Sequence, residues 1–445
     1  MNRIIASVGL VALGAANVHA QMPQTTTMPG GPMAGPAAKW WNVSATVRGF
    51  YDDNLNSVRH PSASDRAWGG EITPQVGINI GNDQTTFEAD YKYAFLYYDH
   101  KPLQQTKKYD QDHTFNMLLN HAFTERYNLR VRDAFVIGQE PDALRYDAAI
   151  HTPYRVSGGN IVNSGGIAFD ASLTPQFGVE VGYNNAFYDY SDTFAPGKNS
   201  DTAGDIFPSV SGALDRIEHT PYVSGLWHLT PQTTASLSYQ YGQINYTANE
   251  PIAGNPASTV IKSDVRNNRS HTGYLGLDHQ FNPNFYGSAE AGASYYDYYN
   301  AGDTSFYPYA RLSLTYIYAE ESSVTAGFQE GRGATDVVGG STAGVTKKDL
   351  VLDSGYSTVY GTIRQRIIPH LFANVIGTAQ HAIFNGGGST VDNKAEDFYQ
   401  VGLNLEYQFT PHFSTHVGYD FNRLDSDIGR SYTRNKAYVG ATASF

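Results

Sequence analysis

The chain has 445 residues, with 30 Lys and Arg against 42 Asp and Glu, and it has no cysteine. Only 16% of its residues are charged, whereas an ordinary soluble domain has about 25%, yet its mean hydropathy is -0.40. The missing cysteine excludes disulfides, thiol catalysis and cysteine-ligated metals, and the acidic balance argues against nucleic acid as a partner. Beyond the N-terminus no apolar run reaches the roughly 20 residues of a membrane-spanning helix. A large β-protein remains, either a soluble sandwich or solenoid or a closed barrel.

Residues 1–20 have the pattern of a secretory signal peptide. Arg3 supplies the positive start, residues 4–16 form a short apolar stretch, and residues 18–20 are a small-x-small cleavage site. An uncleaved anchor helix is the alternative, but this apolar stretch is too short to span a bilayer. We therefore expect the protein to be exported.

A short motif recurs along the chain, in which an apolar residue and usually Thr or Asn precede Pro and a polar residue. Pro fixes φ and lacks the N–H group that a strand ladder needs, so each copy predicts a tight turn between two strands. Copies lie about 40 to 55 residues apart, which leaves room for two strands and one longer loop. The copies with proline are at Pro175, Pro231, Pro283, Pro369 and Pro411, and variants without proline are at 81–83, 124–126 and 319–321.

On both sides of each motif the chain alternates between apolar and polar residues. Before Pro411, for example, Val401, Leu403 and Leu405 alternate with Gly402 and Asn404. Successive residues of a strand face opposite sides, so one face is apolar and the other is small and polar. The predicted strands, 18 in all, span residues 42–53, 67–81, 84–98, 110–123, 127–139, 161–173, 177–190, 217–229, 233–247, 269–281, 285–299, 305–318, 322–335, 352–367, 371–385, 395–409, 413–426 and 430–445.

The composition of the two faces favours a membrane barrel over a soluble sandwich. The polar face is mostly Gly, Ser, Thr, Asn, Gln and Tyr, which suits a wet lumen, and Tyr and Phe gather toward strand ends, as in aromatic girdles. The fold class predicted is all-β: a transmembrane antiparallel up-and-down β-barrel of about 18 strands, or 16, with short periplasmic turns and long extracellular loops. Asp133 is an exception on the apolar face, where we expect a local bulge or a protein neighbour.

The run Tyr51-Asp52-Asp53-Asn54 at the end of the first predicted strand, together with the repeated strand-Thr-Pro-strand hairpins, resembles the β-barrel porin family of Gram-negative bacteria, a group of uncharacterised outer-membrane proteins. The resemblance covers residues 40 to 445. It implies a barrel in the cell outer membrane, linked in some relatives to polysaccharide export, and no enzymatic activity. The terminal Phe445 is similar to the signal by which the barrel-assembly machinery recognises a C-terminal strand. The expected division of the chain is a signal peptide at 1–20, a flexible Met/Pro/Gly-rich periplasmic segment at 21–39 and the outer-membrane barrel at 40–445.

The function expected from these features is a porin-like channel for passive or weakly selective diffusion of small hydrophilic solutes, with sugars and anions as candidates. The alternatives are a structural or adhesive barrel plugged by its loops, and a barrel associated with polysaccharide export. No catalytic residue, metal or cofactor is expected. The alternation predicts a pore-lining set composed of Arg48, Glu88, Asp90, Lys92, Arg130, Arg132, Glu180, Asp278, Glu290, Arg311, Arg364, Arg366, Glu406 and Asp420.

Two pairs of arginines in this set lie two residues apart on one strand and so share a face: Arg130 with Arg132, and Arg364 with Arg366. In one interpretation they neutralise carboxylates on neighbouring strands. In the other they form an electropositive constriction that guides anions.

Overall fold

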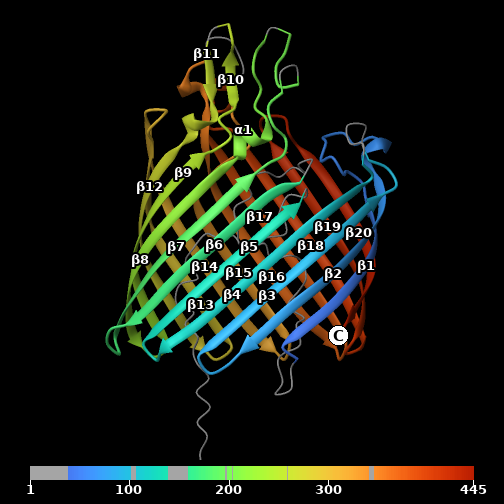
Figure 1. Ribbon diagram of the computed structural model, residues 1–445, viewed down its shortest axis with the longest axis vertical. Coiled ribbons are helices and arrows are strands. Elements are labelled where there is room, and N and C mark those ends of the chain that lie inside the picture. Colours follow the sequence, from blue (N-terminus) through green and yellow to red (C-terminus); the bar gives the residue numbers. More distant parts are fainter. Residues whose placement is uncertain are drawn as a thin grey trace, which may run out of the picture.

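A computed structural model describes residues 39–101, 107–138, 159–195, 198–202, 204–257, 259–339 and 345–445. Eighteen antiparallel strands form one sheet, which closes because the first strand pairs with both the second and the last. Figure 1 shows the inclined strands, with long loops at the top and short turns and the C-terminus at the bottom. All 18 predicted strands are confirmed, which settles the choice against 16. Residues 1–38 lie outside the described ranges, so the signal peptide remains a prediction.

The barrel strands in chain order are β1 (Trp41–Asp52), β2 (Ala67–Gly81), β3 (Thr85–Tyr98), β4 (Tyr109–Thr124), β5 (Tyr127–Gly138), β6 (Asn160–Ser172), β7 (Phe177–Asp189), β8 (Arg216–Thr230), β9 (Thr233–Tyr246), β12 (Asn268–Asn282), β13 (Phe285–Tyr298), β14 (Asp303–Ala319), β15 (Ser322–Gly333), β16 (Val351–Ile368), β17 (Leu371–Gly386), β18 (Ala395–Thr410), β19 (Phe413–Ser426) and β20 (Tyr432–Ser444). The loops carry elements that the alternation did not predict: the hairpin β10 (Pro251–Asn255) and β11 (Thr259–Lys262), the helices α1 (Val210–Leu214) and α2 (Gly388–Val391), and the 3-10 turns η1 (Ala63–Asp65), η2 (Ser263–Arg266) and η3 (Lys347–Asp349). None of the helices in the described ranges is long and apolar enough to cross a bilayer.

The short turns owe their shape to threonine as well as to proline. The Thr174 hydroxyl accepts hydrogen bonds from the backbone N–H groups of Gln176, at 3.3 Å, and Phe177, at 3.0 Å. Thr230 and Thr410 accept in the same way from the residue two positions later. A hydroxyl that bonds the backbone two residues on replaces a missing strand partner. The recurring Thr-Pro pair thus ends one strand and shapes the reversal into the next.

The seam between β1 and β20 uses the acidic run that carries the family resemblance. Asp52 forms a buried ion pair with Arg434, at 2.5 Å between Oδ2 and Nη2, and Asp53 accepts hydrogen bonds from the backbone N–H and side chain of Asn435. Asn54 donates to the carbonyl oxygen of Thr433 at 2.8 Å. The run therefore fastens the first strand to the last one at the loop end of the barrel.

The outer face is a broad apolar surface bounded by two aromatic belts. Near the turns, Phe177 stacks on Trp227 and Phe281 stacks on Phe285, with ring centroids 5.8 and 4.5 Å apart. Near the loops a second belt contains tyrosines such as Tyr183, which lies beside a histidine ring. Aromatic girdles of this kind mark the two interfaces of a membrane-spanning barrel.

Asp133 on this outer face has a protein neighbour. Asn163 of β6 donates to its carboxylate oxygens at 3.1 and 3.3 Å. The registers of β5 with β4 and β6 continue without a shift at this residue, so there is no bulge there. The cost of a carboxylate on the apolar face is thus offset by a hydrogen bond from the adjacent strand.

Candidate functional site

The inner face of the barrel carries the polar residues, and its charged side chains are extensively paired. Arg48 of β1 donates to His416 Nε2 at 2.9 Å, has Glu71 of β2 at 3.9 Å, and lies over the ring of Tyr438. These contacts join β19, β20, β1 and β2 across the seam. The wall here is a network of neighbouring charges and rings.

A second network surrounds Glu180 of β7, which is fully buried. Its Oε2 accepts from Arg130 at 2.5 Å and its Oε1 accepts from the hydroxyl of Tyr222 at 2.6 Å. Arg130 also pairs with Asp170 of β6 at 3.2 Å. Arg132, two residues along the same strand, donates to the amide oxygen of Asn184 at 3.0 Å. Side chains from four consecutive strands, β5 to β8, thus meet on one part of the wall.

The arginines of β16 differ from each other in their surroundings. Arg366 forms ion pairs with Glu320 and Glu321 in the turn between β14 and β15, at 3.0 and 3.2 Å. Arg364 lies over the ring of Phe372 on β17, with its Cζ atom 5.3 Å from the centroid. The two side chains therefore contact different groups, carboxylates of a turn for Arg366 and an aromatic ring for Arg364.

The remaining members of the predicted pore-lining set are spread around the wall. Asp90 of β3 accepts from Asn116 at 3.1 Å, and Glu290 of β13 accepts from the Tyr309 hydroxyl at 2.7 Å. The others, by strand, are Glu88 and Lys92 on β3, Asp278 on β12, Arg311 on β14, Glu406 on β18 and Asp420 on β19.

Aromatic rings on the inner wall lie over glycines of the neighbouring strand. Gly327 faces Tyr360 in the register of β15 with β16, and a Cβ atom on this glycine would be 2.1 Å from the ring. The same relation joins Gly418 to Tyr438. Because glycine has no side chain, the ring can lie flat against the backbone. The alternation did not predict these pairs, because they depend on the register of neighbouring strands. Further pairs of this kind are Gly182 with Tyr222 and Gly69 with Phe50.

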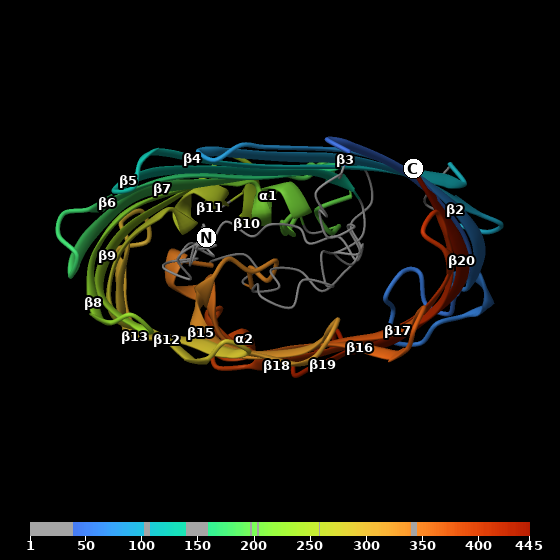
Figure 2. The ribbon, with the colours of Figure 1, turned by 90° about the horizontal axis from the view of Figure 1, so that it is seen from below.

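The long loops pack together at the barrel mouth around their own apolar core. Leu214 of α1, Ile252 of β10, Val265 of η2 and Leu350 before β16 are buried in one cluster, which also contains other loop residues and the loop end of β7. Seen along the barrel in Figure 2, α1, β10 and β11 lie within the outline of the strands. We call these packed loops the loop cap.

Arg266 fastens three parts of the loop cap to one another. Its guanidinium is fully buried and donates to the carbonyl oxygens of Ala213 and Thr335, each at 2.7 Å, and of Leu352 at 3.3 Å. These acceptors belong to the loop before β8, the loop after β15, and β16. One side chain therefore satisfies three backbone groups that burial would otherwise leave without a donor.

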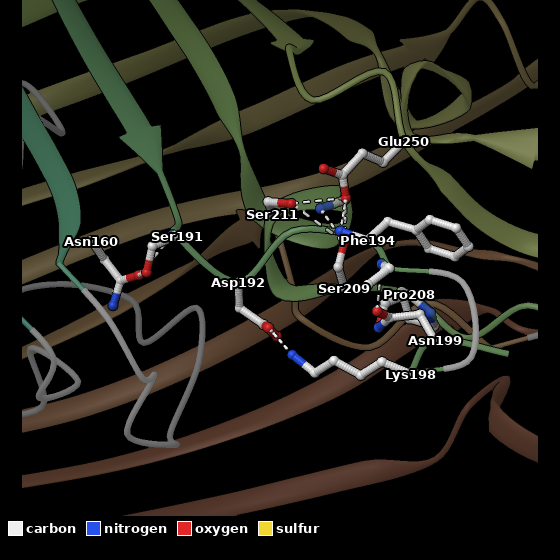
Figure 3. Close-up of polar contacts among 12 residues, drawn as sticks. Asn160, Ser191, Asp192, Phe194, Lys198, Asn199, Pro208, Ser209, Ser211 and Glu250 are labelled. Atoms are coloured by element: carbon white, nitrogen blue, oxygen red, sulfur yellow. Dashed lines mark hydrogen bonds and ion pairs between the residues drawn. The ribbon is translucent and has the colours of Figure 1, made fainter. Parts of the chain in front are cut away.

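A carboxylate cluster organises the loop between β7 and β8. Glu250 Oε2 accepts hydrogen bonds from Ser209 at 2.5 Å, Ser211 at 2.9 Å and the backbone N–H of Phe194 at 2.8 Å (Figure 3). Nearby, Asp215 accepts from the backbone N–H of Tyr190 at 2.7 Å.

Burial, together with the negative charges of Asp189 and Glu250, raises the pKa of the Asp215 carboxyl to about 7, against the Tyr190 hydrogen bond and the positive charge of Arg216. A group with this pKa changes charge near neutral pH, in a loop outside the membrane-spanning strands.

Arg430, in the loop between β19 and β20, joins the loop after β15 to the loop end of β18. Its guanidinium forms ion pairs with Asp336, in the loop after β15, at 2.9 Å, and with Glu396 of β18 at 2.8 Å. The two carboxylates raise the pKa of Arg430 against the effect of burial, so it stays charged. Within the described ranges no three His, Asp or Glu side chains are placed to hold a metal ion.

A closed 18-stranded barrel with an apolar outer band, two aromatic belts and a polar inner wall defines this protein as a transmembrane β-barrel of the outer membrane. It is similar to solved porin structures. OccAB4 of Acinetobacter baumannii superposes with a TM-score of 0.41 at 13% identity, over 93% of this chain and 100% of that one. OccAB2 of the same organism gives 0.43 at 10% identity, over 93% and 99%. The outer membrane protein OpdK of Pseudomonas aeruginosa gives 0.41 at 12%, over 91% and 99%.

No protein-family model matches the sequence, and no curated protein matches it. The class of protein therefore follows from the geometry of the barrel itself.

Proposed function

We propose that this protein is a channel through which small hydrophilic solutes diffuse passively or with weak selectivity across the outer membrane. The observation that carries the proposal is the closed wall of 18 strands with its polar inner face. A barrel wall of 16 to 18 strands encloses more volume than its own side chains fill, which supports an aqueous path. Its partners are the surrounding lipid and the diffusing solute.

The inner wall supports weak selectivity for anions or sugars. Arg130 and Arg366 contact carboxylates, which reduces their field in the lumen, and Arg132 contacts the amide of Asn184. Tyr360 and Tyr438 lie flat over glycines of the inner wall, and Arg48 covers the ring of Tyr438. Paired charges and flat rings suit a path that sorts solutes mildly and binds none of them tightly.

Single-channel recording in a planar bilayer tests this function. We expect discrete ohmic steps from the refolded protein, and a reversal potential in a salt gradient that indicates anion preference. Arg132→Gln should move that potential toward cation preference, while Arg423→Gln, an exposed arginine paired with Asp425 on the outer face, should leave it unchanged. The absence of steps would refute the channel, and a cation preference in the unsubstituted protein would refute the anion assignment.

A structural or adhesive barrel closed by its loops is the second candidate, and the buried core of the loop cap favours it. The two functions differ in one measurement. Liposomes containing a plugged barrel would not swell in an isosmotic monosaccharide, whereas those containing a channel swell at a rate that falls with the size of the sugar. Removal of the β10–β11 hairpin should start swelling if the loops are the plug.

We further propose that the C-terminal strand is the signal for the barrel-assembly machinery. Phe445 is 64% exposed on the turn side and stacks on His412 at 6.1 Å between ring centroids. Its backbone N–H donates to the carbonyl oxygen of Val43 at 2.8 Å. Phe445→Ala should therefore slow assembly into membranes that contain the machinery more than it slows spontaneous refolding in detergent. Equal slowing in both would refute the proposal.

A further inference from the structure

Tyrosine–histidine pairs repeat on the outer face near the loop ends of the strands. In each pair, the histidine lies near the start of a strand that descends from the loops, and the tyrosine lies on an adjacent ascending strand. The register places the histidine opposite the residue two positions after the tyrosine, so the tyrosine is nearer the turns. The pairs, with the distance between Oη and Nδ1, are Tyr91 and His113 at 2.8 Å, Tyr183 and His219 at 2.7 Å, and Tyr239 and His271 at 2.7 Å.

The shared geometry determines where the imidazole proton lies. A phenol hydroxyl is the better donor and an imidazole nitrogen the better acceptor, so we assign Nδ1 as the acceptor in each pair. At His219 a second donor supports this assignment, because the side-chain amide of Asn185 lies 3.3 Å from the same Nδ1. A neutral imidazole that accepts at Nδ1 carries its proton at Nε2. Among the described residues, the hydrogen bonds of the three histidines are made at Nδ1, so each pair has an Nε2–H group that can bind an acceptor.

The position of the pairs relative to the apolar band follows from the strand register. On β4 and β12 a second histidine lies eight residues after the first on the same face: His121 after His113 and His279 after His271. On β8 the corresponding residue is Trp227, eight after His219. Eight residues at about 3.4 Å, inclined by about 40°, span about 21 Å of depth, which is close to the roughly 25 Å apolar band of such barrels. The pairs therefore lie at the headgroup level of the outer leaflet.

We propose that these pairs bind the phosphate groups of phosphorylated lipids in the outer leaflet. A phosphate oxygen accepts a hydrogen bond from Nε2–H, and the tyrosine holds the ring in place for it. At the third pair Arg269 adds a positive charge: it is exposed two residues above His271 on the same face and lies over the ring of Tyr299. Asp297 faces Arg269 in the register of β12 with β13 and is the acidic group beside this site. Basic groups at this level are suited to anionic headgroups.

Native mass spectrometry of the detergent-solubilised protein with lipid A carrying two phosphates tests the proposal. We expect replacement of all three histidines by alanine to weaken lipid binding at least tenfold. Replacement of the three tyrosines by phenylalanine, which removes only the hydroxyls, should weaken it several-fold. The matched control replaces His121 and His279, which are hydrogen-bonded to the hydroxyls of Thr85 and Thr233 at the turn side, and should leave binding unchanged.

Two results would overturn the proposal: undiminished binding by the triple histidine variant, or equal binding of lipid A without phosphates. A change of mobility on a gel when the sample is heated verifies that each variant was a folded barrel before heating. If the triple variant does not fold, His271→Phe and Arg269→Gln, tested singly, should each reduce binding, and no reduction in either would refute the idea. The outcome is independent of channel activity, since the pairs are on the lipid side of the wall.

Discussion

Replacing Arg266 by methionine should release the loop cap and leave the barrel intact. The two 2.7 Å hydrogen bonds from its guanidinium contribute about 1.5–3 kcal/mol each, as bonds from a charged donor. Removing the charge also removes the cost of keeping it out of water, which offsets part of that loss. We expect a net destabilisation of the closed cap of about 2–4 kcal/mol, or roughly 30- to 700-fold in the open population at 1.4 kcal/mol per tenfold.

Amide hydrogen exchange followed by mass spectrometry measures that population, because buried loop amides exchange through local opening. The backbone N–H groups of Val351, bonded to Val338, and of Ser263, bonded to Glu250, should exchange faster by this factor. The exchange rates of the amides that pair β13 with β14 should not change. The control is Arg269→Met, the same substitution three residues away on the exposed outer face. Equal loop exchange in the two variants would show that Arg266 does not hold the cap.

Three further predictions concern the pH response, the seam and the inner wall. The pKa of Asp215 is raised to about 7 from its ordinary 3.8, so between about pH 4 and 7 the folded loop binds a proton that the unfolded chain releases, and the stability of the loop falls as the pH rises. Asp215→Asn should flatten this pH dependence of amide exchange in the loop. An unchanged pH dependence would contradict the raised pKa. Arg434→Ala leaves the buried carboxylate of Asp52 unpaired, at a cost of about 3–5 kcal/mol. The temperature at which heating unfolds the barrel, seen as a change of its mobility on a gel, should therefore fall. An unchanged temperature would show that the seam does not depend on this pair. Gly327→Ala should push the Tyr360 ring off the wall and lower single-channel conductance. Gly49→Ala places no atom within 4 Å of the new methyl group and should leave the conductance unchanged. Equal conductances of the two variants would refute the proposed role of the ring.

The strands were predictable because the signal that specifies them is local. Val401, Leu403 and Leu405 lie on one face wherever the strand is placed, and Pro411 ends that strand through its own ring. The same alternation places Asp133 on the apolar face, but it predicts only that a local bulge or a protein neighbour must offset the cost of the carboxylate there. The partner, Asn163, is 30 residues away along the chain, and no local pattern marks it.

The sequence by itself determined where the strands lie along the chain, the alternation of their two faces and the side of the barrel that carries the long loops, since each depends on residues within a few positions of one another. It left 16 or 18 strands open, and the closed sheet decided for 18. Only the tertiary structure decided which charges are paired, that Asp52 closes the barrel onto Arg434, and that the loops form a buried core around Arg266. These arrangements join segments that are tens to hundreds of residues apart. Their energies come from burial and from hydrogen bonds that exist only after the barrel has closed.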